Sequence, residues 1–171
     1  KALRSALGGD ATAATTEAGP AAEPTGFATI KGTFKLSGAA PQRTVLNIDK
    51  EREVCAPGGK QVLGEQFVVD PATGGIRDVV IYLSDKKFRP GDPKWEHPDF
   101  AAAASATLDY DQKNCIFLTH MQVIRASQRL RILNSDPVGH NTNISATPKA
   151  NPFNQTIPSG GQVMYDPGGE T

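Results

Sequence analysis

The sequence is short of the features that mark several common classes of protein. It holds no run of 18 or more apolar residues, so we expect no transmembrane helix within it. It does not open with the charged and then apolar stretch of a signal peptide, and its first residue is Lys1 rather than Met. We therefore expect either a processed protein or an export signal, anchor or lipid-attachment segment upstream of Lys1 that this sequence omits.

Neither sign of charge dominates the chain. It carries 18 Lys and Arg against 18 Asp and Glu. Nucleic acid and anionic membrane surfaces are held by basic faces, and the only cluster of this kind is Arg125, Arg129 and Arg131. On a strand, residues 129 and 131 share one face, which predicts a solvated strand surface. Nucleic acid is therefore not an expected partner.

Motifs for catalysis are missing as well. The nucleophile elbow G-x-S-x-G is absent, and Ser135, Asp136 and His140 lie on one turn, where neighbours rarely orient one another as a triad requires. The glycine pairs near Pro57 and Ser159 lack the strand, spacing and Lys-Ser/Thr of a phosphate-binding loop. We expect a protein that is not an enzyme.

The residues that are present favour one all-β domain with a tail. A length of 171 residues suits a single core. Apolar residues make up 38%, while 17 Gly and 13 Pro predict many turns. Residues 1–26 contain 19 Ala, Gly, Ser, Thr or Pro, a composition that cannot offset its own ordering entropy. We expect a low-complexity arm over 1–26 and a folded domain over 27–171.

Period-two alternation predicts the strands of that domain. Residues 27–38 alternate, with Ile30, Phe34 and Leu36 on one side and Lys31, Thr33 and Lys35 on the other. Short strands separated by Gly- and Pro-rich turns are typical of a sandwich or barrel. One helical turn is expected at 49–54, and a short helix at 98–106 after a long irregular loop. The further predicted strands are 44–48, 65–70, 76–83, 114–118, 121–124, 128–134, 141–145 and 162–165.

Two cysteines and two histidines are the candidate site residues. In an exported protein, Cys55 and Cys115 are most simply a disulfide. The alternative is that Cys115 is a thiolate that binds copper beside His120 and His140. A straight strand would put Cys115 and His120 on opposite faces, so this alternative needs a bend.

Four segments, in this order, resemble a known family. They are Lys50–Cys55, Asp78–Leu83, Cys115–His120 and Asn134–Asn143, and the resemblance spans roughly residues 27–161. The chain is similar to bacterial cupredoxin-like envelope proteins often labelled methylamine-utilisation-like. This resemblance implies a cupredoxin-like Greek-key β-sandwich, with one short helix and a long loop, in the periplasm or cell envelope.

The resemblance also allows the copper ligands of the family to be compared with the residues of this chain. In copper-competent members, His140 corresponds to the first copper ligand, and the other ligands come from a later Cys-x-x-His-x-Trp-Met segment. These 171 residues do not contain that segment, and Thr119 replaces the family's proline before His120. If the 171 residues are the whole mature chain, we expect a degenerate copper site with no cofactor. If they are a fragment, the resemblance implies a copper site completed by residues outside them.

Three readings of function follow. The first is a non-catalytic accessory or structural subunit of a larger membrane-bound complex, by association an electron-transport or photosynthetic one. The second is a periplasmic copper-binding electron-transfer protein whose ligand set is completed outside this chain. The third is a carbohydrate-binding sandwich, for which Trp95 would need Tyr82 or Tyr110 alongside. In the first reading the arm binds the partner subunits, through Lys1, Ala2, Leu3, Arg4 and Leu7.

Overall fold

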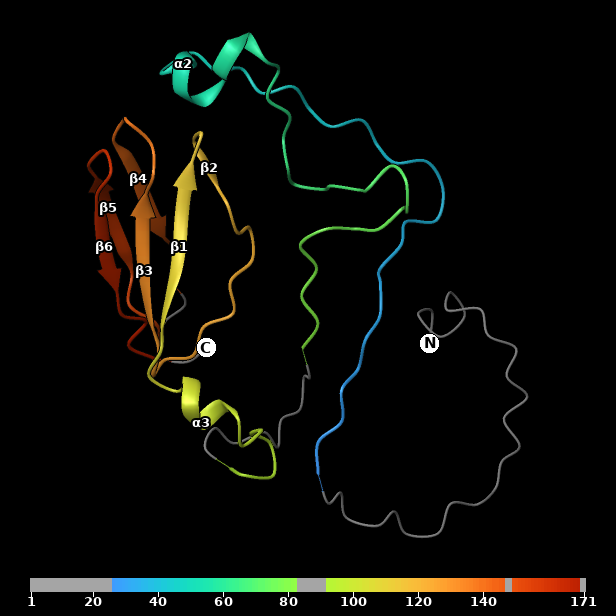
Figure 1. The fold of residues 1–171 in the computed structure, drawn as a ribbon, viewed down its shortest axis with the longest axis vertical. Helices are drawn as coiled ribbons and strands as arrows, with labels where there is room; N and C mark the ends of the chain where they lie inside the picture. The colour runs from blue at the N-terminus through green and yellow to red at the C-terminus, as the bar shows by residue number, and fades with distance from the viewer. Residues whose placement is uncertain (1–25, 83–91, 147–148, 170–171) are drawn as a thin grey trace. The chain divides into compact units, whose positions relative to one another are not determined.

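Two sheets organise the C-terminal half of the chain in the computed structural model, which describes residues 26–82, 92–146 and 149–169. One sheet has four strands in the order β2-β1-β3-β6, and the other pairs β4 with β5 (Figure 1). β1 and β3 run parallel, and the other pairs are antiparallel. The bounds are β1 Thr107–Lys113, β2 Ile116–Phe117, β3 Arg129–Asn134, β4 His140–Ile144, β5 Phe153–Ile157 and β6 Gln162–Tyr165.

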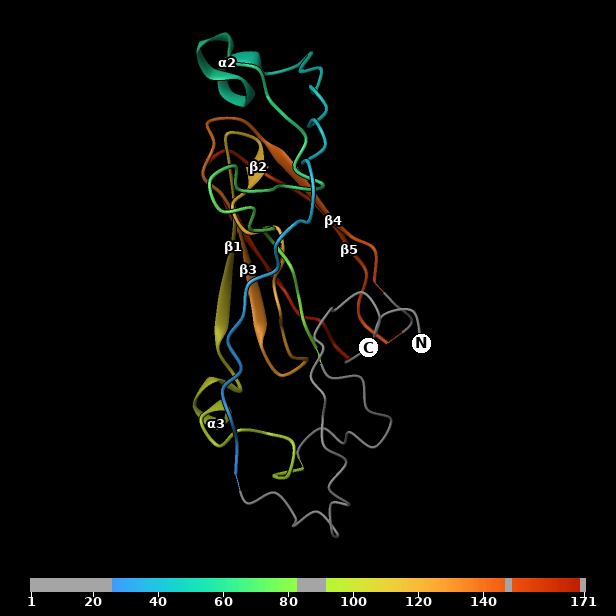
Figure 2. The same ribbon diagram turned by 90° about the vertical axis from the view of Figure 1, so that its right-hand side faces the viewer.

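Alternation along β3 explains which face of the large sheet is buried. Leu130, Ile132 and Asn134 are buried, while Arg129 is exposed and Arg131 partly so. Since side chains alternate along a strand, one face of β3 is apolar and faces the core. Ile157 of β5 and Tyr165 of β6 complete the core with Leu130 and Ile132. The core therefore lies between the two sheets, with β4 and β5 running obliquely to β1 and β3 (Figure 2).

Helical structure is limited to short turns among the described residues. These are α2 (Arg52–Cys55), the 3-10 turn η1 (Pro57–Gly59) and α3 (Phe100–Ala103). The helical turns predicted at 49–54 and 98–106 therefore form, shifted or shortened at their ends. The predominance of strands confirms a β-rich fold.

The strands predicted before residue 83 are not regular strands. The described part of this region has three isolated bridges, Lys35 with Gly75, Val45 with Leu63 and Val69 with Ile76. Phe34 remains 48% exposed and Val45 51% exposed, so the alternation buries neither side chain. Alternation predicts a strand only where a partner strand and a facing layer are available.

The sequence patterns also missed two strands and misplaced another. β1 and β5 were not predicted, and residues 121–124 form no strand. β1 includes two aspartates and β5 includes two amide side chains, which are residues depleted in strands or neutral there. Asn114 and Cys115 form a turn before β2 instead of beginning a strand.

The chain divides into two units, Lys1–Ile30 and Lys31–Thr171. The expected arm at 1–26 lies outside the described residues apart from Gly26, so it stays a prediction, as does its contact with a partner. Within the described ranges, no helix is long and apolar enough to cross a membrane.

Candidate functional site

The turn between β3 and β4 is built around a buried amide. Asn134 is 1% exposed, and its Nδ2 donates to the carbonyl oxygens of Val138, Ile157 and Pro158 at 2.7, 3.1 and 3.1 Å. Its Oδ1 accepts the backbone N–H of Asp136 at 3.0 Å. A buried amide with its donors and acceptor paired fixes the backbone around it. The hydrogen bonds of the Asn134 side chain therefore fix the conformation of the turn, and the turn fixes the start of β4.

Asp136 connects this turn to the β1–β2 hairpin. Its side chain is 3% exposed. Oδ1 accepts the backbone N–H of Asn114 at 2.6 Å, and Oδ2 accepts that of Cys115 at 2.8 Å. His140 Nε2 lies 2.6 Å from the same Oδ2. One carboxylate thus joins two turns that are more than twenty residues apart in the sequence.

The environment of Asp136 keeps it ionised. Burial raises the pKa of this carboxyl. The hydrogen bonds from the Cys115 backbone, the His140 ring and the Asn114 backbone lower the pKa by more, so that it lies below the ordinary value of 3.8. Because an ionised carboxylate only accepts hydrogen bonds, His140 Nε2 carries the hydrogen that it donates to Asp136. The pair is a carboxylate that orients an imidazole, the arrangement found behind metal-binding histidines.

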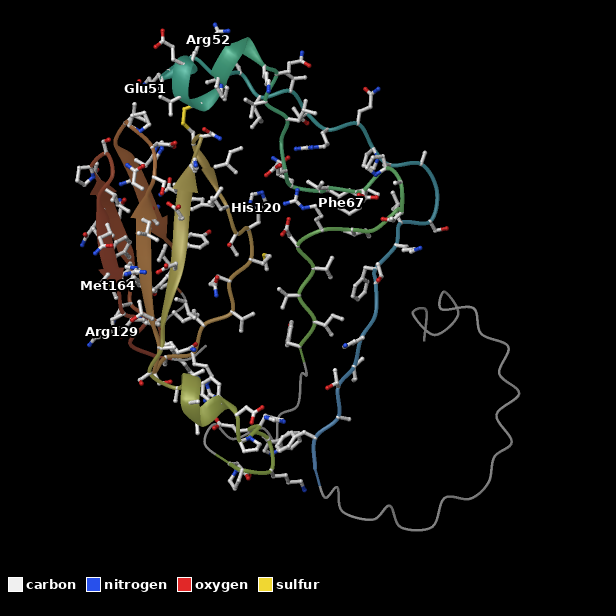
Figure 3. All side chains as sticks on the ribbon, viewed as in Figure 1. Glu51, Arg52, Phe67, His120, Arg129 and Met164 are labelled. Atoms are coloured by element: carbon white, nitrogen blue, oxygen red, sulfur yellow. A yellow bond between two sulfur atoms is a disulfide. The ribbon has the colours of Figure 1, made fainter. Side chains whose placement is uncertain are left out.

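A sulfur atom completes a cluster of three donor groups. Ligand atoms of Cys115, Asp136 and His140 all lie within 4.8 Å of one another. Cys115 is bonded to Cys55, which confirms the disulfide favoured by the sequence. Figure 3 shows this bond in yellow below α2. A disulfide sulfur is not a thiolate, so the cluster in this oxidised state offers a metal one imidazole and one carboxylate.

His120 belongs to a different group of charged residues. Its Nε2 lies 2.5 Å from Glu65 Oε2, and Glu65 Oε1 accepts a hydrogen bond from Arg43 at 3.2 Å. The His120 and Glu65 side chains are 23% and 25% exposed. His120, labelled in Figure 3, is not a member of the cluster around His140. The described residues therefore do not bring His120 and His140 to one metal.

These positions decide how well the described residues fit copper. A blue-copper centre needs two imidazoles and a thiolate in one place. Among the described residues, His140 stands alone as an imidazole in the cluster, and the nearby sulfur is oxidised. They therefore do not fit a complete blue-copper centre.

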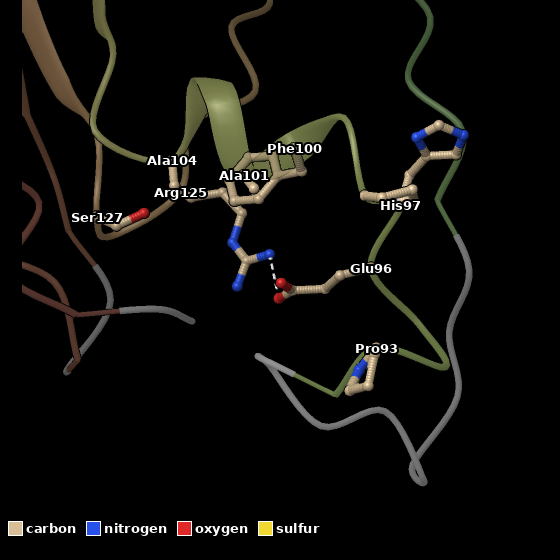
Figure 4. A pocket seen from close by; sticks show the side chains of 9 residues that line it. Pro93, Glu96, His97, Phe100, Ala101, Ala104, Arg125 and Ser127 are labelled. Carbon is tan, nitrogen blue, oxygen red and sulfur yellow. Dashed lines mark hydrogen bonds and ion pairs between the residues drawn. The ribbon is translucent and has the colours of Figure 1, made fainter.

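A small cavity lies beside α3 (Figure 4). Its volume is about 360 Å³, and Glu96, Phe100 and Arg125 are among its lining residues. Arg125 Nη1 donates to Glu96 Oε1 at 2.6 Å, and the guanidinium carbon lies 4.7 Å from the centre of the Phe100 ring. The cation is thus held by an ion pair and by an aromatic face, which points to a structural role for it.

A larger cavity opens over the inner face of the four-stranded sheet. Its volume is about 730 Å³, and its lining includes Tyr82, Tyr110, Leu130 and Tyr165. Burial raises the pKa of Tyr110. The size and apolar lining are those of pockets that hold small organic molecules. Trp95 is half-buried and does not line this cavity, so the cavity does not combine it with Tyr82 and Tyr110 as the carbohydrate-binding alternative would require.

The sequence identified His140 as a candidate metal ligand, but it did not identify Asp136 as a candidate site residue. It argued only against a catalytic triad of Ser135, Asp136 and His140. The structure directs Ser135 Oγ to Asp111 Oδ2 at 2.7 Å, away from His140. What no local pattern reveals is the contact of Asp136 with residues 114 and 115, because it depends on the tertiary fold.

Comparison of the chain with known protein families, with curated proteins and with solved structures finds no match in any of the three.

Proposed function

We propose that this chain is a non-catalytic, cupredoxin-like module of the cell envelope that serves as an accessory or structural subunit of a larger complex. One observation carries the proposal. The candidate ligands from the sequence are each engaged in an internal bond: Cys115 with Cys55, His140 with Asp136, and His120 with Glu65. In the oxidised protein, groups used in this way stabilise a scaffold.

The architecture and the disulfide add support. Two facing sheets with a core between them agree with a β-sandwich, the architecture that the resemblance implies. The disulfide is compatible with an oxidising compartment outside the cytoplasm. The arm at residues 1–26 would then reach the partner subunits.

The test uses the full-length protein purified from its native membrane fraction without a chelator. We expect elemental analysis to find less than stoichiometric copper, and native electrophoresis to place the protein in an assembly larger than the monomer. A version without residues 1–26 should leave that assembly and keep its fold by circular dichroism. One copper per chain, or a monomer in native membranes, would contradict the proposal.

A second function is favoured by the Asp136–His140 pair. A carboxylate that accepts the ring N–H of a histidine orients that ring for a metal, and His140 is 13% exposed. In this alternative the chain is a copper-binding electron-transfer protein whose remaining ligands lie outside the described residues. Stoichiometric copper that disappears in His140→Gln but persists in His120→Gln would establish it.

A further inference from the structure

We propose that reduction of the Cys55–Cys115 disulfide opens a Zn²⁺ site formed by Cys115, Asp136 and His140. The site differs from the copper alternative of the sequence, because it takes the carboxylate of Asp136 as a ligand in place of the His120 ring. It does not rest on the function proposed above. Thiolate, imidazole and carboxylate are the three ligand types that bind zinc in proteins.

The distances place the donors close to a coordination sphere. Zinc bonds of about 2.0–2.3 Å to N, O and S put tetrahedral ligand atoms about 3.3–3.6 Å apart. The donor atoms of the cluster already lie within 4.8 Å of one another. Closing the site therefore asks for shifts on the order of 1 Å, which side-chain rotation about an anchored backbone supplies.

The backbone that presents each donor is fixed by other contacts. Asp136 accepts the N–H groups of Asn114 and Cys115, so the Cys115 backbone is bound to the carboxylate that would share the metal. In the metal-free protein, Asp136 also holds Nε2 of His140 2.6 Å from its own Oδ2, which places the two donor atoms side by side. Asn134 holds the turn from within. The three donors are thus preorganised, and among these contacts the bond to Cys55 is the one that withholds the sulfur.

The chemistry balances with a dithiol as reductant. The dithiol gives two electrons and two protons to the Cys55–Cys115 bond, which becomes two thiols, while the dithiol becomes a disulfide. Zn²⁺ then takes the Cys115 sulfur, whose proton goes to solvent. The His140 ring gives up its Nε2 hydrogen bond to Asp136, carries its hydrogen on Nδ1 instead, and binds the metal through Nε2. Asp136 supplies an oxygen, and water fills the fourth position.

Two single substitutions separate the sulfur ligand from the loss of the disulfide. Cys55→Ser and Cys115→Ser both remove the bond, but only Cys55→Ser keeps the Cys115 thiol. The probe is Co²⁺ followed by Zn²⁺, with the thiolate-to-cobalt charge-transfer absorption as readout. We expect one equivalent of Co²⁺ in Cys55→Ser, displaced by Zn²⁺, and loss of that absorption in Cys115→Ser. The oxidised native protein should show none until it has been reduced with dithiothreitol and separated from that reagent, because a free dithiol would itself bind Co²⁺.

A matched pair of histidine substitutions tests the second ligand. Within Cys55→Ser, His140→Gln should abolish the cobalt absorption, and His120→Gln should leave it unchanged. Both histidines face a carboxylate through Nε2, at 2.6 and 2.5 Å, so the chemical change is the same. Equal binding by the Cys55→Ser and Cys115→Ser proteins, or no effect of His140→Gln, would overturn the proposal.

The zinc site can also be tested if loss of the disulfide unfolds the chain. Metal that binds only the folded state shifts the equilibrium toward it. Zn²⁺ should then restore the strand signal in the circular dichroism of Cys55→Ser and leave Cys115→Ser unfolded. Recovery in both proteins, or in neither, would equally refute the site.

Discussion

At the scale of single residues, Asp136 carries more of the structure than its place in a turn indicates. Its carboxylate is nearly inaccessible to solvent, and it accepts hydrogen bonds from two backbone N–H groups and one ring. Hydrogen bonds to a charged group are worth about 1.5–3 kcal/mol each when the partner is buried. Its role in holding the two turns together is therefore independent of any metal.

Replacing Asp136 with Asn should destabilise the oxidised protein by about 3 kcal/mol. The amide presents an NH₂ group where the carboxylate accepted an N–H, so at least one donor loses its partner. The measurement is urea unfolding at pH 7. The matched control is Asp109→Asn, which breaks a pair with Arg131 at 2.7 Å in which both side chains are about half exposed, and it should change stability far less than Asp136→Asn does.

The pH dependence of this loss has a definite sign. The folded-state pKa of Asp136 is lowered, so its stabilisation is fully present above the ordinary value of 3.8 and disappears as the pH falls through the lower folded-state value. The difference between the wild type and Asp136→Asn should therefore shrink below pH 3.8. A difference that is constant over this range would mean that the carboxylate charge contributes nothing.

At the scale of elements, the β1–β2 hairpin depends on two residues with positive φ. Asn114 and Cys115 have φ of 53° and 62°, and they form a two-residue loop between the paired Lys113 and Ile116. Two-residue hairpins of this kind prefer Asn followed by Gly. Cysteine at the second position places its sulfur toward Cys55, although its backbone conformation is unusual for a side chain of this size.

Asn114→Ala should therefore cost about 1 kcal/mol, since alanine tolerates the left-handed region poorly. Asn114→Gly should be close to neutral, because glycine adopts this conformation freely. Thermal unfolding of the two variants beside the wild type measures the difference. If alanine and glycine gave the same stability, the backbone conformation at 114 would not be what limits the hairpin.

The central strand β3 gives a second prediction at this scale. Ile132 is fully buried between the sheets, whereas Met164 on the neighbouring β6 is 48% exposed. Ile132→Ala should destabilise the protein by about 2–5 kcal/mol, because the cavity and the lost burial add together. Met164→Ala should change stability by less than about 0.5 kcal/mol. Denaturation midpoints of similar size for both would contradict the assignment of the inner face.

Elements also show how far the sequence predicts this fold. β3 and β6 were predicted almost to the residue, because Leu130 and Ile132 alternate with charged neighbours and Tyr165 closes a short run. The region before residue 83 has the same alternation, yet Phe34 and Val45 are largely exposed. The candidate site is also only partly predictable. The sequence pattern identified His140 and the disulfide, whereas the contacts of Asp136 with residues 114 and 115 depend on tertiary structure.

At the scale of the whole molecule, the disulfide connects parts of the chain that the buried core does not hold together. Among the described residues the buried apolar cluster consists of Leu130, Ile132, Ile157 and Tyr165. α2, which ends at Cys55, contains no buried residue. The bond between Cys55 and Cys115 spans 60 residues of sequence and ties this element to the hairpin of the sheet. A long closed loop of this kind limits the unfolded chain strongly.

Reduction should therefore lower the free energy of unfolding by about 4 kcal/mol, the loop-entropy value for a ring of this length. Urea unfolding with and without dithiothreitol measures it, with a chelator present so that no metal offsets the loss. The double variant Cys55→Ser, Cys115→Ser should match the reduced protein and should not respond to dithiothreitol. Superimposable curves for the oxidised and reduced wild type would mean that packing already fixes α2 against the sheet, and that the disulfide is available for exchange without a loss of stability.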